Sequence, residues 1–313
     1  MITDYIKGLH HVTATVNDAR EDYDFYTRTL GLRLVKKTVN FDNNQVYHFY
    51  YGTEVGTPGT IMTTFPYKGH GVRDGIIGTG QVHTTSFSVP SGSLDYWAQR
   101  LSEVDVKTSP KTRFGFETLQ FQDPSGLNLE LVANEEDPRA PWGVGGIPLQ
   151  YAIRGFFTAI MAIEEIGPTL DFLKSVFGLA KVGQEGPITR LAAQGGGAGN
   201  YVDVWSAPEM EKGLNGLGTV HHLAWRIESE AEQLELRQHL VETLGMKVTE
   251  VKDRKYFRSI YFRIPGGVLF EVATIPPGFT VDESKEELGL DLKLPPWEEP
   301  HRQQIEQVLP QIP

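Results

Sequence analysis

The sequence contains no cysteine, and this absence excludes several kinds of chemistry at once. Disulfide bonds, thiolate metal sites and a cysteine nucleophile are all ruled out. Long hydrophobic runs are also missing: no stretch approaches the roughly 18 apolar residues of a membrane-spanning helix, and residues 1–7 lack the apolar core of a signal peptide. We therefore expect a cytoplasmic protein with no membrane partner.

Positive charge is scarce as well. The chain has 29 Lys and Arg against 40 Asp and Glu, a formal net charge of −11, and no basic patch is evident. Because contact with phosphate backbones needs such a patch, we expect no nucleic-acid partner. A hydrophobic content of 40% is ordinary for a globular protein, and 313 residues favour two domains or one large one.

One helix-like segment recurs along the chain. Residues 24–32, DFYTRTLGL, match residues 171–179, DFLKSVFGL, nearly type for type, and a third version, LVETLGM, ends at Met246. Each has apolar residues at helical spacing and then a glycine, the usual residue of a left-handed helix C-cap. A fourth, weaker helix is expected over residues 93–101.

Strand-like runs of alternating polarity surround each of these helices. The sequence predicts a strand, a helix and three further strands, repeated four times from about residues 8, 80, 152 and 218. Residues 134–148 are rich in Pro, Gly and acidic residues and predict a linker. We expect an α+β protein with an N-terminal half, 1–145, that holds modules 1 and 2, and a C-terminal half, 146–313, that holds modules 3 and 4 and a tail.

Two histidine doublets stand in the first strands of modules 1 and 4: His10-His11 and His221-His222. Successive side chains of a strand point to opposite faces. Alternation places His11 and His222 with small or polar residues, as in a cavity wall, and His10 and His221 with apolar ones. The second histidine of each doublet is therefore the better candidate for a ligand.

Comparison of the modules indicates which of them kept a histidine. At the places of His11 and His222, module 2 has Thr84 and module 3 has Phe157. The remaining histidines lack partners in the sequence, and we interpret them as structural or surface residues: His48, His70, His83, His239 and His301.

A carboxylate can be compared in the same way. Glu271 ends the string GVLFE in module 4, and Glu130 ends GLNLE in module 2. Module 1 has Thr63-Thr64 at that place, and module 3 has Asp203 nearby. We interpret Glu130 as a relic or a hydrogen-bonded core carboxylate.

Only modules 1 and 4 can jointly supply two histidines and a carboxylate: His11, His222 and Glu271. This set leaves three positions open on an octahedral ion, which suits an Fe(II) that takes a bidentate organic oxygen ligand and O2. A hydrolytic zinc site could use the same ligands around one water, so ligand type leaves both options open. The first and last modules must meet for such a site to form.

Four such modules with one His–His–Glu set resemble the vicinal oxygen chelate superfamily, which includes glyoxalases, bleomycin resistance proteins and extradiol dioxygenases. The resemblance covers nearly the whole chain, and within the superfamily the chain looks like the ring-cleaving dioxygenases of hydroquinones and catechols. It rests on the strings GLHHVT (8–13), TPGTIMTTF (57–65), VHH (220–222), PGGVLFE (265–271) and GFTVDE (278–283). The resemblance implies βαβββ modules paired into half-barrels, with the metal site shared by modules 1 and 4.

The resemblance also implies roles for individual residues. In the para-diol branch the ligands are the second histidine of each doublet and this glutamate, which here are His11, His222 and Glu271. Tyr261 would donate a hydrogen bond to a bound phenolate, with a packing role in the core as the alternative. The other residues expected to support catalysis are His10, Thr13, His221 and Arg254.

The implied function is an Fe(II)-dependent ring-cleaving dioxygenase that acts on a small aromatic diol with O2. Mn(II) and Zn(II) are the other candidate metals, para-diol and ortho-diol cleavage both stay open, and a homo-oligomer is one possible assembly. One alternative is a glyoxalase-like isomerase or lyase, although such enzymes normally take a further glutamate where this chain has Thr63-Thr64. The other is a metal-free protein that binds an aromatic compound or antibiotic.

Overall fold

The computed structural model describes residues 1–313 and shows the strand–helix–three-strand module four times, as the sequence predicts. Module 1 comprises β1 (Leu9–Val16), α1 (Ala19–Asp24), β2 (Arg33–Asn40), β3 (Asn43–Gly52) and β4 (Ile61–Pro66). Module 2 comprises β5 (Gln81–Val89), α2 (Leu94–Ser102), β6 (Ser109–Arg113), β7 (Phe116–Gln122) and β8 (Asn128–Ala133). Module 3 comprises β9 (Gly155–Ile163), α3 (Ile166–Ser175), β10 (Ala180–Glu185), β11 (Ile188–Ala192) and β12 (Tyr201–Ser206). Module 4 comprises β13 (Thr219–Ile227), α4 (Glu230–Gln238), β14 (Lys252–Asp253), β15 (Arg258–Arg263) and β16 (Leu269–Thr274).

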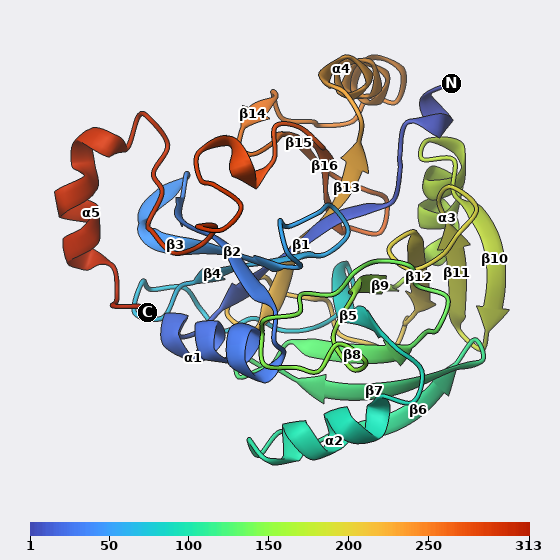
Figure 1. The fold of residues 1–313 in the computed structure, drawn as a ribbon. Coiled ribbons are helices and arrows are strands. Elements are labelled where there is room, and N and C mark those ends of the chain that lie inside the picture. Colours follow the sequence, from blue (N-terminus) through green and yellow to red (C-terminus); the bar gives the residue numbers. More distant parts are fainter.

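The modules pair into two curled, eight-stranded sheets (Figure 1). One has the order β14-β15-β16-β13-β1-β4-β3-β2 and joins module 4 to module 1, and the other has the order β10-β11-β12-β9-β5-β8-β7-β6 and joins module 3 to module 2. The expected α+β fold of paired half-barrels is therefore confirmed. Each sheet takes one module from each half of the chain.

Helices cover the outer faces of the sheets, and apolar residues fill the space between. The helix α1 packs on β4, α2 on β7, α3 on β12 and α4 on β16. The outer face of β1 carries Val12, Ala14 and Val16, all fully buried, because alternation sends them toward the helices. The inner face of the same strand is left to polar residues. None of the helices is both long and apolar enough to span a bilayer.

The first histidine doublet lies at a break in the pairing of β1 with β13. Leu9 pairs with Trp225 and His11 with Ala224, so that β1 holds one extra residue, His10, at this place. In such a β-bulge two residues of one strand lie opposite a single residue of its partner, and the side chains near it change direction. Strict alternation of faces therefore fails at this place.

The second doublet lies at the matching break in the partner strand. Thr13 pairs with His222 and Ala14 with Val220, so that His221 is the extra residue of β13. The two bulges are reciprocal, and each brings a whole doublet to the seam between modules 1 and 4. The prediction that His221 belongs with the outer apolar face was wrong, because its side chain lines the same inner cavity as His222.

The second sheet has the same two breaks where β5 pairs with β9. The extra residue of β5 is His83, followed by Thr84, and the extra residue of β9 is Phe157, followed by Thr158. The equivalent of His11 is therefore Thr158. The prediction that placed Phe157 there was wrong, because it counted along the strand without the bulge.

The C-terminal tail crosses from module 4 onto module 1 and ends in α5 (Arg302–Val308), beside β3 (Figure 1). Its anchor is the fully buried amine of Lys36, which pairs with Asp282 at 2.6 Å and also with Glu283. Lys255 pairs with the same Asp282. The tail thus ties β2 of module 1 to the hairpin before β15 of module 4.

Candidate metal centre

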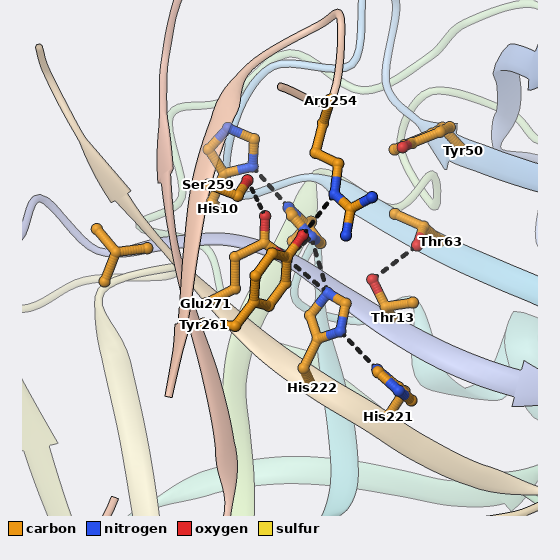
Figure 2. A network of polar contacts seen from close by, with 12 residues as sticks. His10, Thr13, Tyr50, Thr63, His221, His222, Arg254, Ser259, Tyr261 and Glu271 are labelled. Carbon is orange, nitrogen blue, oxygen red and sulfur yellow. Dashed lines mark hydrogen bonds and ion pairs between the residues drawn. The ribbon is translucent and has the colours of Figure 1, made fainter. Parts of the chain in front are cut away.

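Three potential ligand atoms meet where β1, β13 and β16 lie side by side (Figure 2). The Nε2 atoms of His11 and His222 are 3.2 Å apart. The Oε2 atom of Glu271 lies 3.1 Å from His11 Nε2 and 2.8 Å from His222 Nε2. All three side chains are buried.

These separations fit a metal ion. Ligand atoms 2.0–2.2 Å from an ion stand about 3.0 Å apart when they subtend right angles, and about 3.4 Å apart at tetrahedral angles. The three separations in the centre lie around the smaller value. The arrangement therefore suits one face of an octahedral ion, the geometry of two-histidine, one-carboxylate iron sites.

The first histidine of each doublet supports the second. His11 Nδ1 lies 2.9 Å from His10 Nδ1, and His222 Nδ1 lies 2.8 Å from His221 Nδ1. Burial, reinforced by the adjacent histidine, lowers the pKa of His10 and of His221 to about 3, so both stay neutral and can accept a hydrogen bond. We assign the Nδ1 proton to the ligand histidines, which leaves both Nε2 atoms as lone-pair donors.

The carboxylate is held in the same way. Burial opposes ionisation of Glu271, but interaction with His11 and His222 holds its pKa well below the usual value. Its second oxygen, Oε1, accepts a hydrogen bond from the Ser259 hydroxyl. With the Nδ1 protons assigned as above, the two Nε2 lone pairs and the Glu271 oxygen converge, and a metal cation held by them would supply the positive charge that stabilises this carboxylate.

Tyr261 and Arg254 stand beside this centre. Arg254 Nε donates to the Tyr261 hydroxyl oxygen at 3.0 Å, and Arg254 also pairs with Asp42 at 3.0 Å. Burial and the charge of Glu271 raise the pKa of Tyr261, so its hydroxyl keeps its proton. Because a guanidinium only donates, the Tyr261 proton is free for another acceptor.

A series of hydrogen bonds runs through module 1 from Thr13 to Tyr50. Thr13 Oγ1 is 2.8 Å from Thr63 Oγ1, and Thr63 Oγ1 is 2.9 Å from His48 Nε2. His48 Nδ1 is in turn 2.9 Å from the Tyr50 hydroxyl. The prediction that His48 lacks partners was therefore wrong: its ring is bonded at both nitrogens.

The centre opens into a cavity of about 540 Å³. Aromatic side chains form much of its wall, among them Phe41, Phe65 and Phe257, while Arg254 and Lys252 lie toward module 4. An apolar wall with a few convergent polar groups is typical of a small-molecule site.

The corresponding place in the second sheet is filled by arginine. Arg113 makes a bidentate pair with Glu130 at 2.9 and 2.5 Å, and Arg190 makes one with Asp203 at 2.8 Å. Arg113 Nε is also 3.4 Å from Asp203. Glu130 is thus a hydrogen-bonded core carboxylate, and arginines neutralise both of these buried acids.

The structure brings all eight predicted site residues together: His10, His11, Thr13, His221, His222, Arg254, Tyr261 and Glu271. Ser259, His48 and Tyr50 are further polar groups of the site that the sequence did not predict. Ser259 could have been found, because it stands two residues from Tyr261 and so shares its face of β15. His48 and Tyr50 share a face of β3 for the same reason, but their link to Thr13 depends on β4 lying between.

The chain is similar to a superfamily that includes dioxygenases and to individual proteins named as dioxygenases. Residues 8–131 match the family model of the Glyoxalase/Bleomycin resistance protein/Dioxygenase superfamily. A relative from Bacillus subtilis (strain 168), named "Putative ring-cleaving dioxygenase MhqO", is 46% identical over 302 residues, which cover 96% of this chain and 95% of the relative. A "Chlorohydroquinone/hydroquinone 1,2-dioxygenase" from Sphingobium indicum is 37% identical over 300 residues, which cover 93% of this chain and 92% of that enzyme. A crystal structure from Bacillus subtilis, described as a "putative dioxygenase", matches with a TM-score of 0.94 and 45% identity, and covers 99% of this chain and 98% of its own.

Proposed function

The chain belongs to the Glyoxalase/Bleomycin resistance protein/Dioxygenase superfamily, and from this membership we propose that it is an Fe(II)-dependent dioxygenase that opens the ring of a hydroquinone or catechol with O2. The observation that carries the proposal is the set of three convergent donors, two imidazole nitrogens and one carboxylate oxygen, at the floor of an aromatic-lined cavity. The names of the relatives, which include a hydroquinone dioxygenase, support it.

His11, His222 and Glu271 would hold the iron, with Mn(II) or Zn(II) as other candidates. When bound there, Fe(II) supplies the electron-transfer chemistry between a diol and O2. The protein contributes the geometry of the ligands and the handling of protons.

The ligands are kept in one orientation by their neighbours. His10 and His221 accept the Nδ1 protons of the ligand histidines, and Ser259 donates to the outer oxygen of Glu271. Such contacts fix the imidazole tautomer and increase the basicity of the ligands. Their role is therefore to position the ligands.

Tyr261 would serve as the hydrogen-bond donor to the substrate oxygen that carries developing negative charge. Arg254 Nε donates a hydrogen bond to the Tyr261 hydroxyl oxygen, which leaves the hydroxyl proton of Tyr261 available for the substrate. Removal of one such donor typically costs about 100-fold or more in kcat. Thr13, bonded to Thr63 and opposite His222 in the sheet, would close the other side of the site.

The isomerase alternative needs another ligand where Thr63 stands. The Thr63 hydroxyl is engaged by Thr13 and His48, and no carboxylate belongs to the three-donor group beyond Glu271. This observation favours the dioxygenase.

The test begins with protein purified without oxygen, whose bound metal is identified by mass spectrometry. After anaerobic loading with Fe(II), hydroquinone or catechol is added in aerated buffer, and O2 uptake and product absorbance are followed. We expect uptake with ring opening, loss of both metal and uptake in His222→Ala, and retention of both in Thr84→Ala, the equivalent position of the second sheet.

Three outcomes would contradict the proposal. Hemithioacetal turnover without O2 uptake would favour the isomerase. Iron-free protein that binds aromatic rings equally well after His222→Ala would favour the metal-free binder. Absence of O2 uptake with every diol and hydroquinone tried would reject ring cleavage.

A further inference from the structure

Tyr50 presents a hydroxyl to the cavity from β3, two strands along the sheet from the ligand strand β1. It lies on β3, which is separated from β1 by β4, and its ring packs against Phe279 and Phe257 in a small core of its own. Figure 2 shows its hydroxyl end turned toward the centre of the site. Nothing in the proposed chemistry at the three ligands uses this group.

The hydrogen-bond chain behind Tyr50 fixes its hydroxyl but does not satisfy it. The sole hydrogen bond of this hydroxyl joins it to His48 Nδ1 at 2.9 Å, while His48 Nε2 is taken by Thr63. Burial lowers the pKa of His48 well below its usual value, so the ring is neutral and has one donor and one acceptor nitrogen. Both ring nitrogens of His48 are therefore engaged, and His48 cannot hydrogen-bond a ligand. The Tyr50 hydroxyl is the group in this series that can still form a hydrogen bond.

The remaining hydrogen-bonding capacity of Tyr50 suits a hydroxyl group in particular. If the Tyr50 proton goes to His48, the Tyr50 oxygen has a lone pair to accept a proton from a ligand. If His48 donates to Tyr50, the Tyr50 proton is free to be donated. A ligand hydroxyl can answer either case, because it both donates and accepts, whereas an ether or a halide can only accept.

The position of Tyr50 also suits a molecule with two separated oxygens. Neighbouring strands lie about 4.8 Å apart, so β3 is roughly 10 Å along the sheet from β1. Because the sheet is curled, the inner faces of β1 and β3 both point toward one cavity. Tyr50 and the three ligands line this cavity together. The wall between them includes Phe65 and Phe257, which offer apolar contact to a ring.

We propose that the Tyr50 hydroxyl, oriented by His48, binds the substrate hydroxyl that does not face His11, His222 and Glu271. Tyr50 is the group that contacts substrate, and His48 is a positioning residue that acts through it. The inference rests on the proposed function only in that the ligand is a dihydroxylated aromatic ring.

The test measures binding without turnover. The full chain is loaded with Fe(II), kept free of oxygen and titrated by calorimetry with hydroquinone and with phenol, which lacks the second hydroxyl. A single net hydrogen bond predicts that hydroquinone binds about 5- to 10-fold more tightly than phenol. In Tyr50→Phe this ratio should fall to about 1, with the affinity for phenol changed less than about twofold.

Two further variants separate contact from structure. Tyr51→Phe removes the neighbouring hydroxyl, which bonds Asp22 on the opposite face of β3, and should keep the wild-type ratio. His48→Leu should lower the ratio and His48→Gln, whose amide both donates and accepts, should restore part of it. A general loss of packing would weaken both ligands alike and leave the ratio unchanged.

The inference is overturned if wild-type protein binds both ligands equally, or if Tyr50→Phe keeps the preference for hydroquinone. Its outcome is independent of the proposed reaction. A preference that depends on Tyr50 in protein that consumes no O2 would reject the dioxygenase and retain this site. Uptake of O2 with a preference that ignores Tyr50 would do the reverse.

Discussion

Replacement of His221 by Phe should weaken metal binding although His221 is not a ligand. The change removes the acceptor that lies 2.8 Å from His222 Nδ1 and leaves a buried N–H group without a partner. Such a group costs about 1–3 kcal/mol, which corresponds to about 5- to 150-fold in affinity. Losses of about 10- to 100-fold are usual when the partner of a metal-bound histidine is removed.

Competition between the full-length protein and a chromogenic chelator for Fe(II), carried out without oxygen, measures this affinity directly. His221→Asn is the rescue variant, because its amide oxygen can take the place of Nδ1, and it should recover most of the loss. His83→Phe is the matched control, since His83 is the extra residue of the equivalent bulge in the second sheet. Unchanged affinity in His221→Phe, or an equal loss in His83→Phe, would show that His221 does not support the ligand His222.

Two further predictions concern stability. Burial raises the pKa of Asp22 to about 8 against an ordinary value of 3.8, so between these values the folded chain holds a proton that the unfolded chain has released. The stabilisation that comes from this bound proton is complete below pH 3.8. Between pH 3.8 and pH 8 the free energy of unfolding falls by about 1.4 kcal/mol per pH unit. The free energy of unfolding of Asp22→Asn in urea should therefore gain about 4 kcal/mol on wild type from pH 4.5 to 7.5, and a constant difference would contradict the assigned protonation. Arg113→Met should strand the buried Glu130 carboxylate and destabilise the protein by about 3–5 kcal/mol in urea unfolding. The same variant should keep its iron affinity, because Arg113 lies in the other sheet, and a stable variant or one that loses iron would count against this account.

The sequence was sufficient for the ligand set because each ligand stands on a strand with a clear pattern. His11 and His222 fall at equivalent positions of modules 1 and 4, and Glu271 falls where module 2 has Glu130. The superfamily resemblance added His10, Thr13 and His221 on the histidine strands, and Tyr261 and Arg254 on or next to β15. The sheet order β16-β13-β1 then makes them neighbours without any further assumption.

What could not be read from the sequence depends on pairing between distant strands. A β-bulge is one unpaired residue, and the composition around His10 or His221 does not reveal it, so alternation assigned their faces by a rule that the bulge breaks. The place of Phe157 was wrong for the same reason. His48 meets Thr63 only because β3 lies beside β4, and Arg113 meets Asp203 only because modules 2 and 3 share a sheet.

Modules 2 and 3, which share one sheet, lie between modules 1 and 4 along the chain, and modules 1 and 4 share the other sheet. During synthesis, residues 9–66 leave the ribosome first, yet the edge of β1 stays unpaired until residues 219–227 arrive. The inner sheet can meanwhile close around acids that arginines from its own modules already neutralise. The proposed metal centre would then be completed last, because a product terminated before module 4 would contain every strand of the inner sheet but lack His222 and Glu271.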